Sequence, residues 1–256
     1  MFKLFHKSPK LQVIDIHGTI SVSSKKYSHF NVISSLRDSM KNDDIKGVLL
    51  RINSPGGSAG ASMELAMVIE KVAKVKPVVV HISDMGCSGA LLAAVAATKI
   101  VASPMALIGS IGVLMSIPDI QEIADKLGVK MRVIKSGNMK DIGSPFRDLT
   151  SQEQQFLQHS ITATHEQFMK YVQTKRNIID IEDISDGRFF NAPEAYALNL
   201  IDKLGDICDA MDYLIHLCKL TDQVKWLYPK QDLMEKVISK MSLITPDWIT
   251  SKMMYT

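Results

Sequence analysis

Two nearly continuous apolar runs constrain the fold most strongly, and each is followed by a glycine-containing turn. They are residues 47–52 and 78–82. Strands that are apolar on both faces are typical of parallel sheets covered by helices. The predicted strands cover residues 11–16, 47–52, 78–82, 99–102 and 129–134, and the predicted helices cover 31–40, 61–74, 88–97, 117–127, 150–176, 193–198 and 207–220. This alternation predicts an α/β fold with a mainly parallel sheet.

Length and composition fit one domain with a sizeable core. The chain has 256 residues, 46% of them hydrophobic and 22% charged, and no linker rich in Gly, Ser or Pro divides it. We therefore expect one domain over residues 1–220. Residues 221–256 differ in character, and we expect a helical tail that packs on the core or on a neighbouring subunit. Its predicted apolar stripe consists of Leu233, Met234, Val237, Ile238 and Met241.

Charge and hydropathy argue against several classes of protein. The net charge is +3, without a basic patch interleaved with aromatic residues, so nucleic-acid binding is not expected. The amino end has no apolar stretch of signal-peptide length. The longest aliphatic run, residues 90–97, is far shorter than the roughly 20 residues of a membrane helix. We expect a cytoplasmic or peripherally membrane-associated protein.

The cysteines and histidines suggest neither disulfides nor a metal site. The three cysteines are sparse, which fits a reducing compartment. No His-x-x-x-His or Cys-x-x-Cys spacing occurs, so no metal and no other cofactor is expected. Cys87 is expected to be a small packed side chain rather than a nucleophile.

Ser88 is the candidate nucleophile, because it lies at a predicted turn between the strand 78–82 and the helix 88–97. At the amino end of a helix, its hydroxyl would be exposed, and the amide of Gly89 would point at a developing oxyanion. Taken alone, a serine at this place is more often a helix cap than a nucleophile.

Gly57 is the candidate second donor to an oxyanion. It ends the loop 53–57, whose two glycines can turn a backbone amide outward after a buried strand. The loop follows the strand next to the one that leads to Ser88, at the sheet edge where α/β proteins bind ligands. A plain Pro-Gly turn is the alternative interpretation.

Lys140 is the candidate base, on the glycine-containing loop 135–141. A lysine accepts a proton only when it is uncharged. Apolar neighbours such as Met139 and Ile142 would favour the uncharged amine, whereas a nearby Asp141 carboxylate would oppose it.

Ser110 could orient that lysine, because it lies on a second glycine-marked loop, residues 108–113. Histidines are the rival bases. None of them lies on a glycine loop or has a recognisable acid partner, so a Ser-His-Asp triad is disfavoured but stays open. His81, for instance, is expected to point into the packing of the sheet.

The motifs, in unbroken order from about Leu11 to about Lys219, resemble the signal peptide peptidase A family. They are Asn53-Ser54-Pro55-Gly56-Gly57, Cys87-Ser88-Gly89, Gly109-Ser110-Ile111-Gly112-Val113, Lys135-Ser136-Gly137 followed by Lys140-Asp141, and Asp186-Gly187-Arg188-Phe189-Phe190 leading into residues 195–202. The ordered series makes the resemblance specific.

The resemblance implies a Clp-protease/crotonase-like fold, a repeated β-β-α superhelix. It implies a serine peptidase with Ser88 as nucleophile, Lys140 as base and Ser110 as the residue that orients the lysine. The amides of Gly57 and Gly89 would form the oxyanion hole. Members with one copy of the motifs form ring-like homo-oligomers whose active sites are shared between subunits. They cleave remnant signal peptides or other short apolar peptides through an acyl-enzyme.

The chain departs from the family pattern at three places. The usual Ser-Gly-Gly-Tyr is Ser88-Gly89-Ala90-Leu91 here, which alters the pocket beside the serine. The membrane anchor common at the amino end is not found, and residues after Leu220 match no part of the family. Two other functions stay open: an acyl-CoA hydratase or thioesterase on the same fold, and a non-catalytic ring scaffold that binds peptides.

Overall fold

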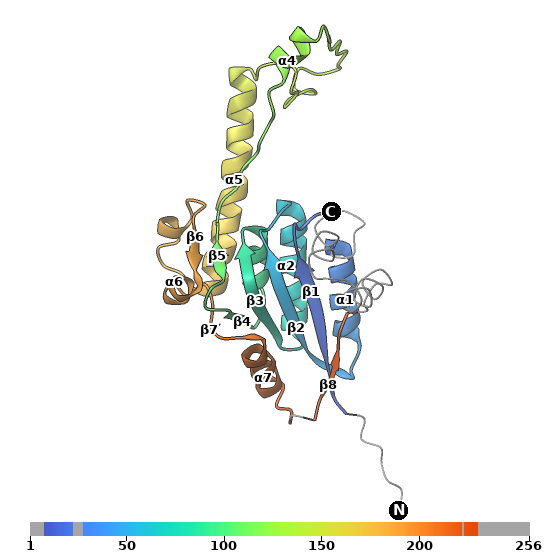
Figure 1. Cartoon of the computed structure of the whole chain (residues 1–256), viewed down its shortest axis with the longest axis vertical. Coiled ribbons are helices and arrows are strands. Elements are labelled where there is room, and N and C mark those ends of the chain that lie inside the picture. Colours follow the sequence, from blue (N-terminus) through green and yellow to red (C-terminus); the bar gives the residue numbers. More distant parts are fainter. Residues whose placement is uncertain (1–7, 23–27, 222, 230–256) are drawn as a thin grey trace, which may run out of the picture.

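The computed structural model describes residues 8–22, 28–221 and 223–229. Within these ranges, eight strands form one mixed sheet in the order β6-β5-β3-β2-β1-β8, with β4 paired to β3 and β7 paired to β4 (Figure 1). The strands are β1 (Lys10–His17), β2 (Ile45–Ser54), β3 (Val78–Cys87), β4 (Lys99–Ala102), β5 (Leu107–Gly109), β6 (Phe189–Asn191), β7 (Lys203–Leu204) and β8 (Lys225–Leu227). The helices are α1 (His29–Lys41), α2 (Ala59–Ala73), α3 (Gly89–Ala94), α4 (Gln121–Lys126), α5 (Ser151–Arg176), α6 (Ala192–Ala197) and α7 (Ile207–Leu217), with a 3-10 turn at Glu182–Ile184.

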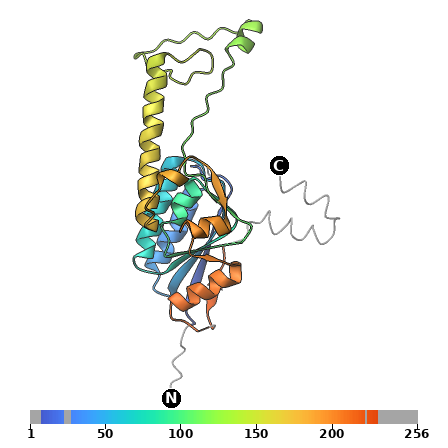
Figure 2. The same cartoon turned by 90° about the vertical axis from the view of Figure 1, so that its left-hand side faces the viewer.

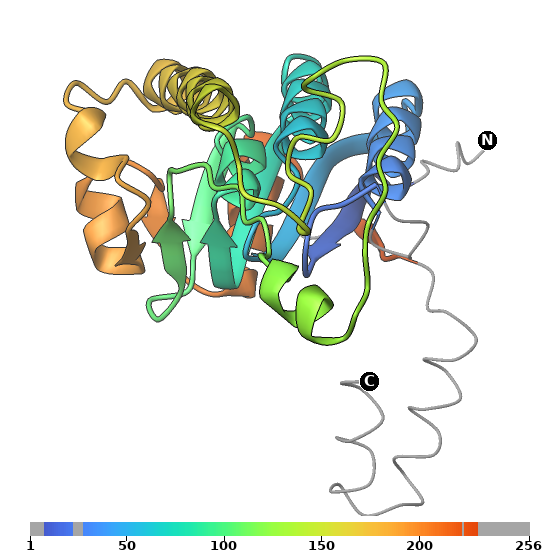
Figure 3. The same ribbon diagram turned by 90° about the horizontal axis from the view of Figure 1, so that it is seen from above.

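The apolar runs of β2 and β3 fill the core on both faces of the sheet, as their sequence predicts. Leu50 and Val80 belong to the larger apolar cluster, which includes residues of α1, α2, α3 and α5. Leu49 and Val79 belong to the cluster under α7. Successive strand residues point to opposite faces, so one continuous run serves both layers. Figure 3 shows α1, α2 and α5 together on one face of the sheet.

The predicted mainly parallel α/β sheet is confirmed. Among the described residues, the pairs β1–β2, β2–β3, β3–β4 and β3–β5 are parallel, and β5–β6 is antiparallel. The parallel arrangement brings the carboxyl ends of β2 and β3 to the same edge, with Ser54 paired to Gly86. The loops that follow these two strands therefore meet.

Helix α5 spans 26 residues and extends well beyond the body of the molecule (Figures 1 and 2). Its carboxyl half packs on the core through Phe168 and Val172. Its amino end begins at a capping box, in which the side chains of Thr150 and Glu153 bond to each other's backbone amides. Residues 113–150, here called the arm, lead away from the body to that far end of α5.

The prediction of a strand over residues 129–134 is wrong for the isolated chain. These residues are not assigned to a strand, and the alternating apolar side chains of Val129, Met131 and Val133 are all exposed. An alternating pattern needs a partner strand and a surface to cover one face, and the described part of the chain brings neither to this segment. The predicted helix 117–127 is shortened to α4.

The tail differs in part from its predicted helix. Residues 225–227 form β8, which pairs in parallel with β1, and Trp226 packs against the cluster under α7. The segment after residue 220 thus contributes a strand to the main sheet. The predicted stripe Leu233, Met234, Val237, Ile238 and Met241 lies outside the described residues. Within the described ranges, none of the helices combines the length and apolar character that crossing a bilayer requires.

Candidate active site

Ser88 occupies a sharp turn between β3 and α3, and its backbone is held in an unusual conformation. Its φ is 51° and its ψ is −124°, a region that side chains other than glycine rarely adopt. The Ser88 N–H donates to the carbonyl of Gly109 at 2.8 Å, and the Leu92 N–H donates to the Ser88 carbonyl at 3.0 Å. A turn of this kind exposes the hydroxyl at the end of the strand.

The Ser88 hydroxyl does not act as a helix cap, which removes the more ordinary interpretation of this residue. The structure records no capping hydrogen bond from its side chain to α3. The adjacent thiol of Cys87 is buried, and burial raises its pKa to about 11, so it stays protonated near neutral pH. The expectation that Cys87 is a packed side chain is confirmed, and Ser88 is left as the nucleophile candidate at this turn.

Gly57 and Gly89 bring two backbone segments as close together as glycine allows. A Cβ on Gly57 would lie 2.1 Å from the carbonyl oxygen of Ile20, and a Cβ on Gly89 would lie 2.1 Å from Ser62 Oγ. The same Cβ on Gly89 would be 3.5 Å from the Gly57 nitrogen. A Cβ on Gly56 would be 2.8 Å from the Ser88 Cβ. The amide nitrogens of the two loops therefore converge beside the serine.

Ile20 holds the Gly57 loop from the far side. Its N–H donates to the Gly56 carbonyl at 2.8 Å, and its carbonyl accepts from the Ser58 N–H at 2.9 Å. These bonds use the groups on either side of Gly57. No hydrogen bond of the Gly57 amide to another described backbone group is found, and Gly57 itself lines the neighbouring cavity.

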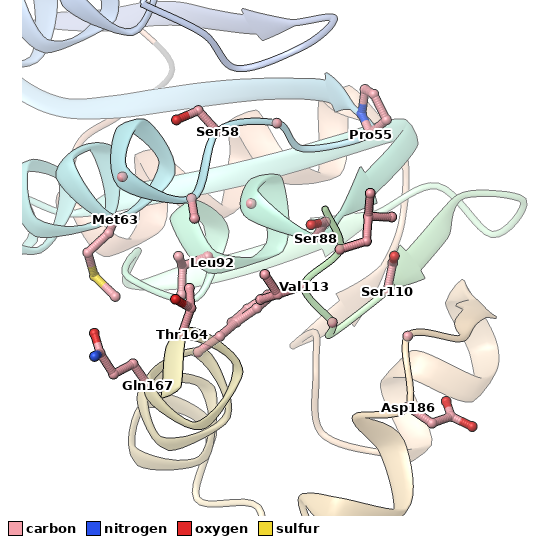
Figure 4. A pocket seen from close by; sticks show the side chains of 18 residues that line it. Pro55, Ser58, Met63, Ser88, Leu92, Ser110, Val113, Thr164, Gln167 and Asp186 are labelled. Atoms are coloured by element: carbon pink, nitrogen blue, oxygen red, sulfur yellow. The ribbon is translucent and has the colours of Figure 1, made fainter. Parts of the chain in front are cut away.

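A cavity of about 940 Å³ opens at this point (Figure 4). Ser88, Gly57, Gly89 and Ser110 all line it. Figure 4 shows Ser88 and Ser110 at one end of the cavity, and Met63 and Gln167 at the other. The remaining lining residues are Pro55, Ser58, Ala59, Gly60, Leu92, Gly112, Val113, Leu114, Thr164, Phe168, Asp186 and Gly187.

Ser110 lies in a second strained turn, next to that of Ser88. Its φ is 53°, and its N–H donates to the carbonyl of Arg188 at 2.7 Å. Since the preceding residue, Gly109, accepts the hydrogen bond from the Ser88 amide, the two serine turns form one unit. Four of the five predicted site residues therefore lie together.

Lys140 is the exception, because it lies on the arm and does not line the cavity. The Lys140 side chain is exposed, and the backbone N–H of Lys140 donates to the Gly137 carbonyl at 3.1 Å. Arg147 bonds to both Asp141 of this loop and Glu153, and so attaches the loop 135–141 to the amino end of α5. Phe168, farther along α5, lines the cavity. The helix rises about 22 Å between Glu153 and Phe168, at about 1.5 Å per residue. Within one chain, Lys140 thus belongs to the amino end of α5, whereas Ser88 lies beside the later part of the helix that lines the cavity.

Within the described ranges, the structure does not bring any histidine to the cavity as a base. The residues that line the cavity include no histidine. His81 is buried on β3, and burial lowers its pKa; its Nε2 has no hydrogen-bond partner among the described residues. It alternates with Val80 and Ile82 of the larger cluster, so it points to the opposite face of the sheet. The described residues also contain no group of three or more His, Cys, Asp or Glu side chains that could hold a metal ion.

Two features of the site were not predicted from the sequence. The wall opposite the glycine loops comes from α5, through Thr164, Gln167 and Phe168. Ser62 packs directly behind Gly89 and donates to the Ser58 carbonyl at 2.8 Å. These residues lie in ordinary helical patterns, and only the packing of α2 and α5 around α3 brings Ser62 behind Gly89 and the three α5 residues to the cavity.

Comparison with known proteins finds relatives that are named as proteases. Residues 70–221 match peptidase family S49. A protein assigned as a protease in Methanocaldococcus jannaschii is 40% identical over 192 residues, which are 74% of this chain and 62% of that protein. A protein assigned as signal peptide peptidase SppA in Enterococcus faecium is 30% identical over 223 residues, 83% of this chain and 65% of that protein. The chain thus spans somewhat less than two thirds of these relatives.

A further relative and a solved structure extend the comparison. Protease 4 of Salmonella typhi is 35% identical over 190 residues, 73% of this chain and 31% of that protein. A variant of the 1510-N membrane-bound stomatin-specific protease superposes with a TM-score of 0.60 at 14% identity, covering 88% of this chain and all of that one, which shows a shared fold. The protease names of the relatives support a peptidase. By the match over more than half of its length, the chain belongs to peptidase family S49.

Proposed function

We propose that this protein is a serine endopeptidase in which Ser88 is the nucleophile and Lys140 of a neighbouring copy is the base. The observation that carries the proposal is the turn of Ser88, whose uncapped hydroxyl faces a cavity beside the converging Gly57 and Gly89 amides. A serine, two outward amides and a nearby cavity are the parts that acyl transfer needs.

The reaction would proceed through an acyl-enzyme. Uncharged Lys140 takes the hydroxyl proton as Ser88 Oγ bonds to the peptide carbonyl carbon, and the Gly57 and Gly89 amides hold the oxyanion. The C–N bond then breaks, and Lys140 returns the proton to the leaving amine. Water, activated by the same amine, hydrolyses the ester. Ser110, beside Ser88, would accept a hydrogen bond that orients the lysine.

A second copy is required because one chain does not bring its own lysine to its own serine. The arm also exposes many apolar side chains, which favours burial against another copy. They include Leu114, Met115, Ile123, Leu127, Val129, Met131, Val133 and Ile134. We therefore propose a ring-like homo-oligomer whose arms carry Lys140 to the cavity of the next subunit, on a fold of the Clp-protease/crotonase type.

Short apolar peptides, such as remnant signal peptides, are the proposed substrates. The side chains of Met63, Leu92, Val113, Leu114 and Phe168 give the cavity apolar walls. Its size, about 940 Å³, fits a few residues of an extended peptide rather than a folded protein. The Enterococcus faecium relative carries the name of a signal peptide peptidase.

A serine-directed probe provides the first test. We expect the probe to acylate a peptide that contains Ser88, in an assembly larger than one chain, and we expect Ser88→Ala to abolish the label. Saturable binding of acyl-CoA esters without acylation of Ser88 would instead favour the hydratase or thioesterase interpretation. An intact assembly that never takes the label would favour a scaffold.

Mixed assemblies test the shared site. Ser88→Ala and Lys140→Ala subunits should each be inactive alone, because nucleophile and base act as a unit. After dissociation and joint reassembly at equal amounts, about a quarter of the junctions would pair an intact serine with an intact lysine. Recovery of roughly that share of activity supports a site built from two copies. Activity of either single variant alone contradicts the Ser-Lys assignment.

A further inference from the structure

The loop that carries Lys140 is closed by hydrogen bonds of a second lysine. Lys135 Nζ donates to the Asn138 carbonyl at 3.0 Å and to Asp141 Oδ1 at 2.5 Å. The Lys140 N–H bonds to the Gly137 carbonyl inside this closed loop. The position of Lys140 therefore depends on what holds Asp141.

Arg147 holds Asp141 with a two-pronged contact. Its Nε donates to Asp141 Oδ2 at 3.0 Å and its Nη2 to Oδ1 at 2.9 Å. The other side of the same guanidinium donates to both carboxylate oxygens of Glu153, at 2.9 and 2.6 Å. A planar guanidinium can bridge two carboxylates in this way, and a lysine ammonium cannot.

Glu153 is the fixed end of this chain of contacts. It is only 2% exposed, and it caps the start of α5 through its bonds to Thr150. Salt bridges to Arg147 hold the pKa of Glu153 well below its usual value, and contacts with Arg147 and Lys135 do the same for Asp141. Both carboxylates are thus charged near neutral pH and hold Arg147 between them.

We propose that Arg147 is a positioning residue that fixes the Lys140 loop to the amino end of α5 and balances the negative charge of Asp141 next to Lys140. This inference rests on the proposed role of Lys140 as base. An unbalanced Asp141 carboxylate would favour the charged amine, which cannot accept a proton. Lys135 and Arg147 both bond to the Asp141 carboxylate, so their positive charges offset its effect on Lys140, and the same bonds keep the loop oriented.

The other charged groups near the loop belong to the segment that packs on it. Ile120 donates its N–H to the Pro145 carbonyl at 2.9 Å, and the Ile117 side chain lies beside Gly143. This segment and the start of α5 carry Asp119, Glu122, Asp125, Lys126, Lys130, Arg132 and Asp148. Of these, Glu122 pairs with Lys126, and Asp148 offers its backbone carbonyl to Arg147.

Two variants of Arg147, made in the whole 256-residue chain, separate its two tasks. Arg147→Lys keeps the charge but loses the bridge, so kcat should fall about tenfold while the acid limb of the kcat/KM pH profile stays in place. Arg147→Met loses both, so kcat should fall and the acid limb should move to higher pH by about half a unit. Adding Asp141→Asn to Arg147→Met should move the limb back. If Arg147 were merely structural, its loss would lower kcat, but the acid limb would not shift up in Arg147→Met and back down when Asp141→Asn is added.

The matched control is Arg132→Met, which removes an exposed arginine from the same arm, while Asp141 and Glu153 keep their partners. It should keep the profile of the unmodified protein. If Arg147→Met does not fold, Lys135→Met removes the other cation from Asp141 and carries the same prediction for the acid limb.

A readout without turnover completes the test. In a Ser88→Ala background, the Lys140 amine is labelled with an acylating reagent across a pH range, and the peptide is quantified by mass spectrometry. The pH of half-labelling should rise with Arg147→Met. An unmoved half-labelling pH together with unchanged kcat would overturn the inference. Activity that survives Ser88→Ala or Lys140→Ala would instead overturn the proposed function, so the two failures are distinguishable.

Discussion

The amide of Ser88 donates a 2.8 Å hydrogen bond to the carbonyl of Gly109. This bond joins the turn of the candidate nucleophile to the turn that begins at Ser110, and both serines have a positive φ. Two strained turns that hold each other are typical of a site where position outweighs local stability. The predictions below start from that strain.

The conformation of Ser88 should cost stability that glycine would recover. Glycine adopts a positive φ without strain, which stabilises the folded state, but it loses more conformational entropy on folding than alanine does. The first effect should be the larger, so Ser88→Gly should be more stable than Ser88→Ala by about 1 kcal/mol. Both variants should lack peptidase activity. Urea unfolding of the two variants measures the difference, and equal stabilities would mean that the turn relaxes.

Gly57 should not tolerate even one methyl group. Because a Cβ there would lie 2.1 Å from the Ile20 carbonyl oxygen, Gly57→Ala must displace the loop and its amide. We expect kcat to fall by about 10²–10³, the usual cost of losing one oxyanion donor. Steady-state kinetics on a short apolar peptide would measure it.

Gly18→Ala is the matched control for that experiment. Gly18 also has a positive φ, 69°, but a Cβ there meets nothing within 4 Å. It should lose about 1 kcal/mol of stability through backbone strain alone and keep its kcat. A similar loss of kcat in both variants would count against an oxyanion role for Gly57.

Asp202 should make the fold sensitive to acid. Burial opposes its ionisation, but Arg176, Lys99 and the Ile100 amide, at 2.9, 3.0 and 2.8 Å, outweigh burial and lower its pKa. A lowered pKa in the folded state means that the stabilisation is present above the unfolded value of about 3.9 and is lost as the pH falls below it.

Asp202→Asn should therefore lose about 2–3 kcal/mol at pH 7, because Arg176 is nearly buried and keeps its charge. Its stability should also depend less on pH below about 4. Urea unfolding at several pH values tests both statements, with Asp38→Asn on the exposed face of α1 as control. An unchanged acid dependence would show that another carboxylate dominates.

The exposed apolar side chains of the arm should matter for assembly and not for folding. Ile134 is fully exposed in the single chain, so Ile134→Asp should leave the melting temperature of the dissociated chain unchanged. If the arm docks on another copy, the substitution should lower the mass measured by light scattering and lower activity with it. Met105→Asp, at an exposed position on the body, is the control. If Met105→Asp also prevents assembly, the prediction that the arm is the docking surface is contradicted.

The sequence predicted the central sheet well, because its signals are local. Each face of β2 and β3 is buried, so an unbroken apolar run such as residues 78–80 has few alternatives to an inner strand. The capping pair Thr150 and Glu153 likewise marks the start of α5 by its own spacing. These elements depend little on distant parts of the chain.

The short strands and the arm could not be predicted in this way. β5, β6 and β7 have two or three residues each, too few to show a period. Residues 129–134 do show a strand period, but a strand also needs a partner, and the described chain offers none. Ser88 and Lys140 were predicted from motifs, whereas their separation along α5 becomes visible only in three dimensions.

That separation matters to a newly synthesised chain. If Ser88 and Lys140 have the proposed roles, a solitary molecule, with its lysine at the amino end of α5 and its serine beside the later part of that helix, would hold a nucleophile without a proton acceptor. Under the proposed mechanism, such a molecule would be dormant, and hydrolysis would begin only above the concentration at which copies find each other. Dilution alone would then switch the protein off.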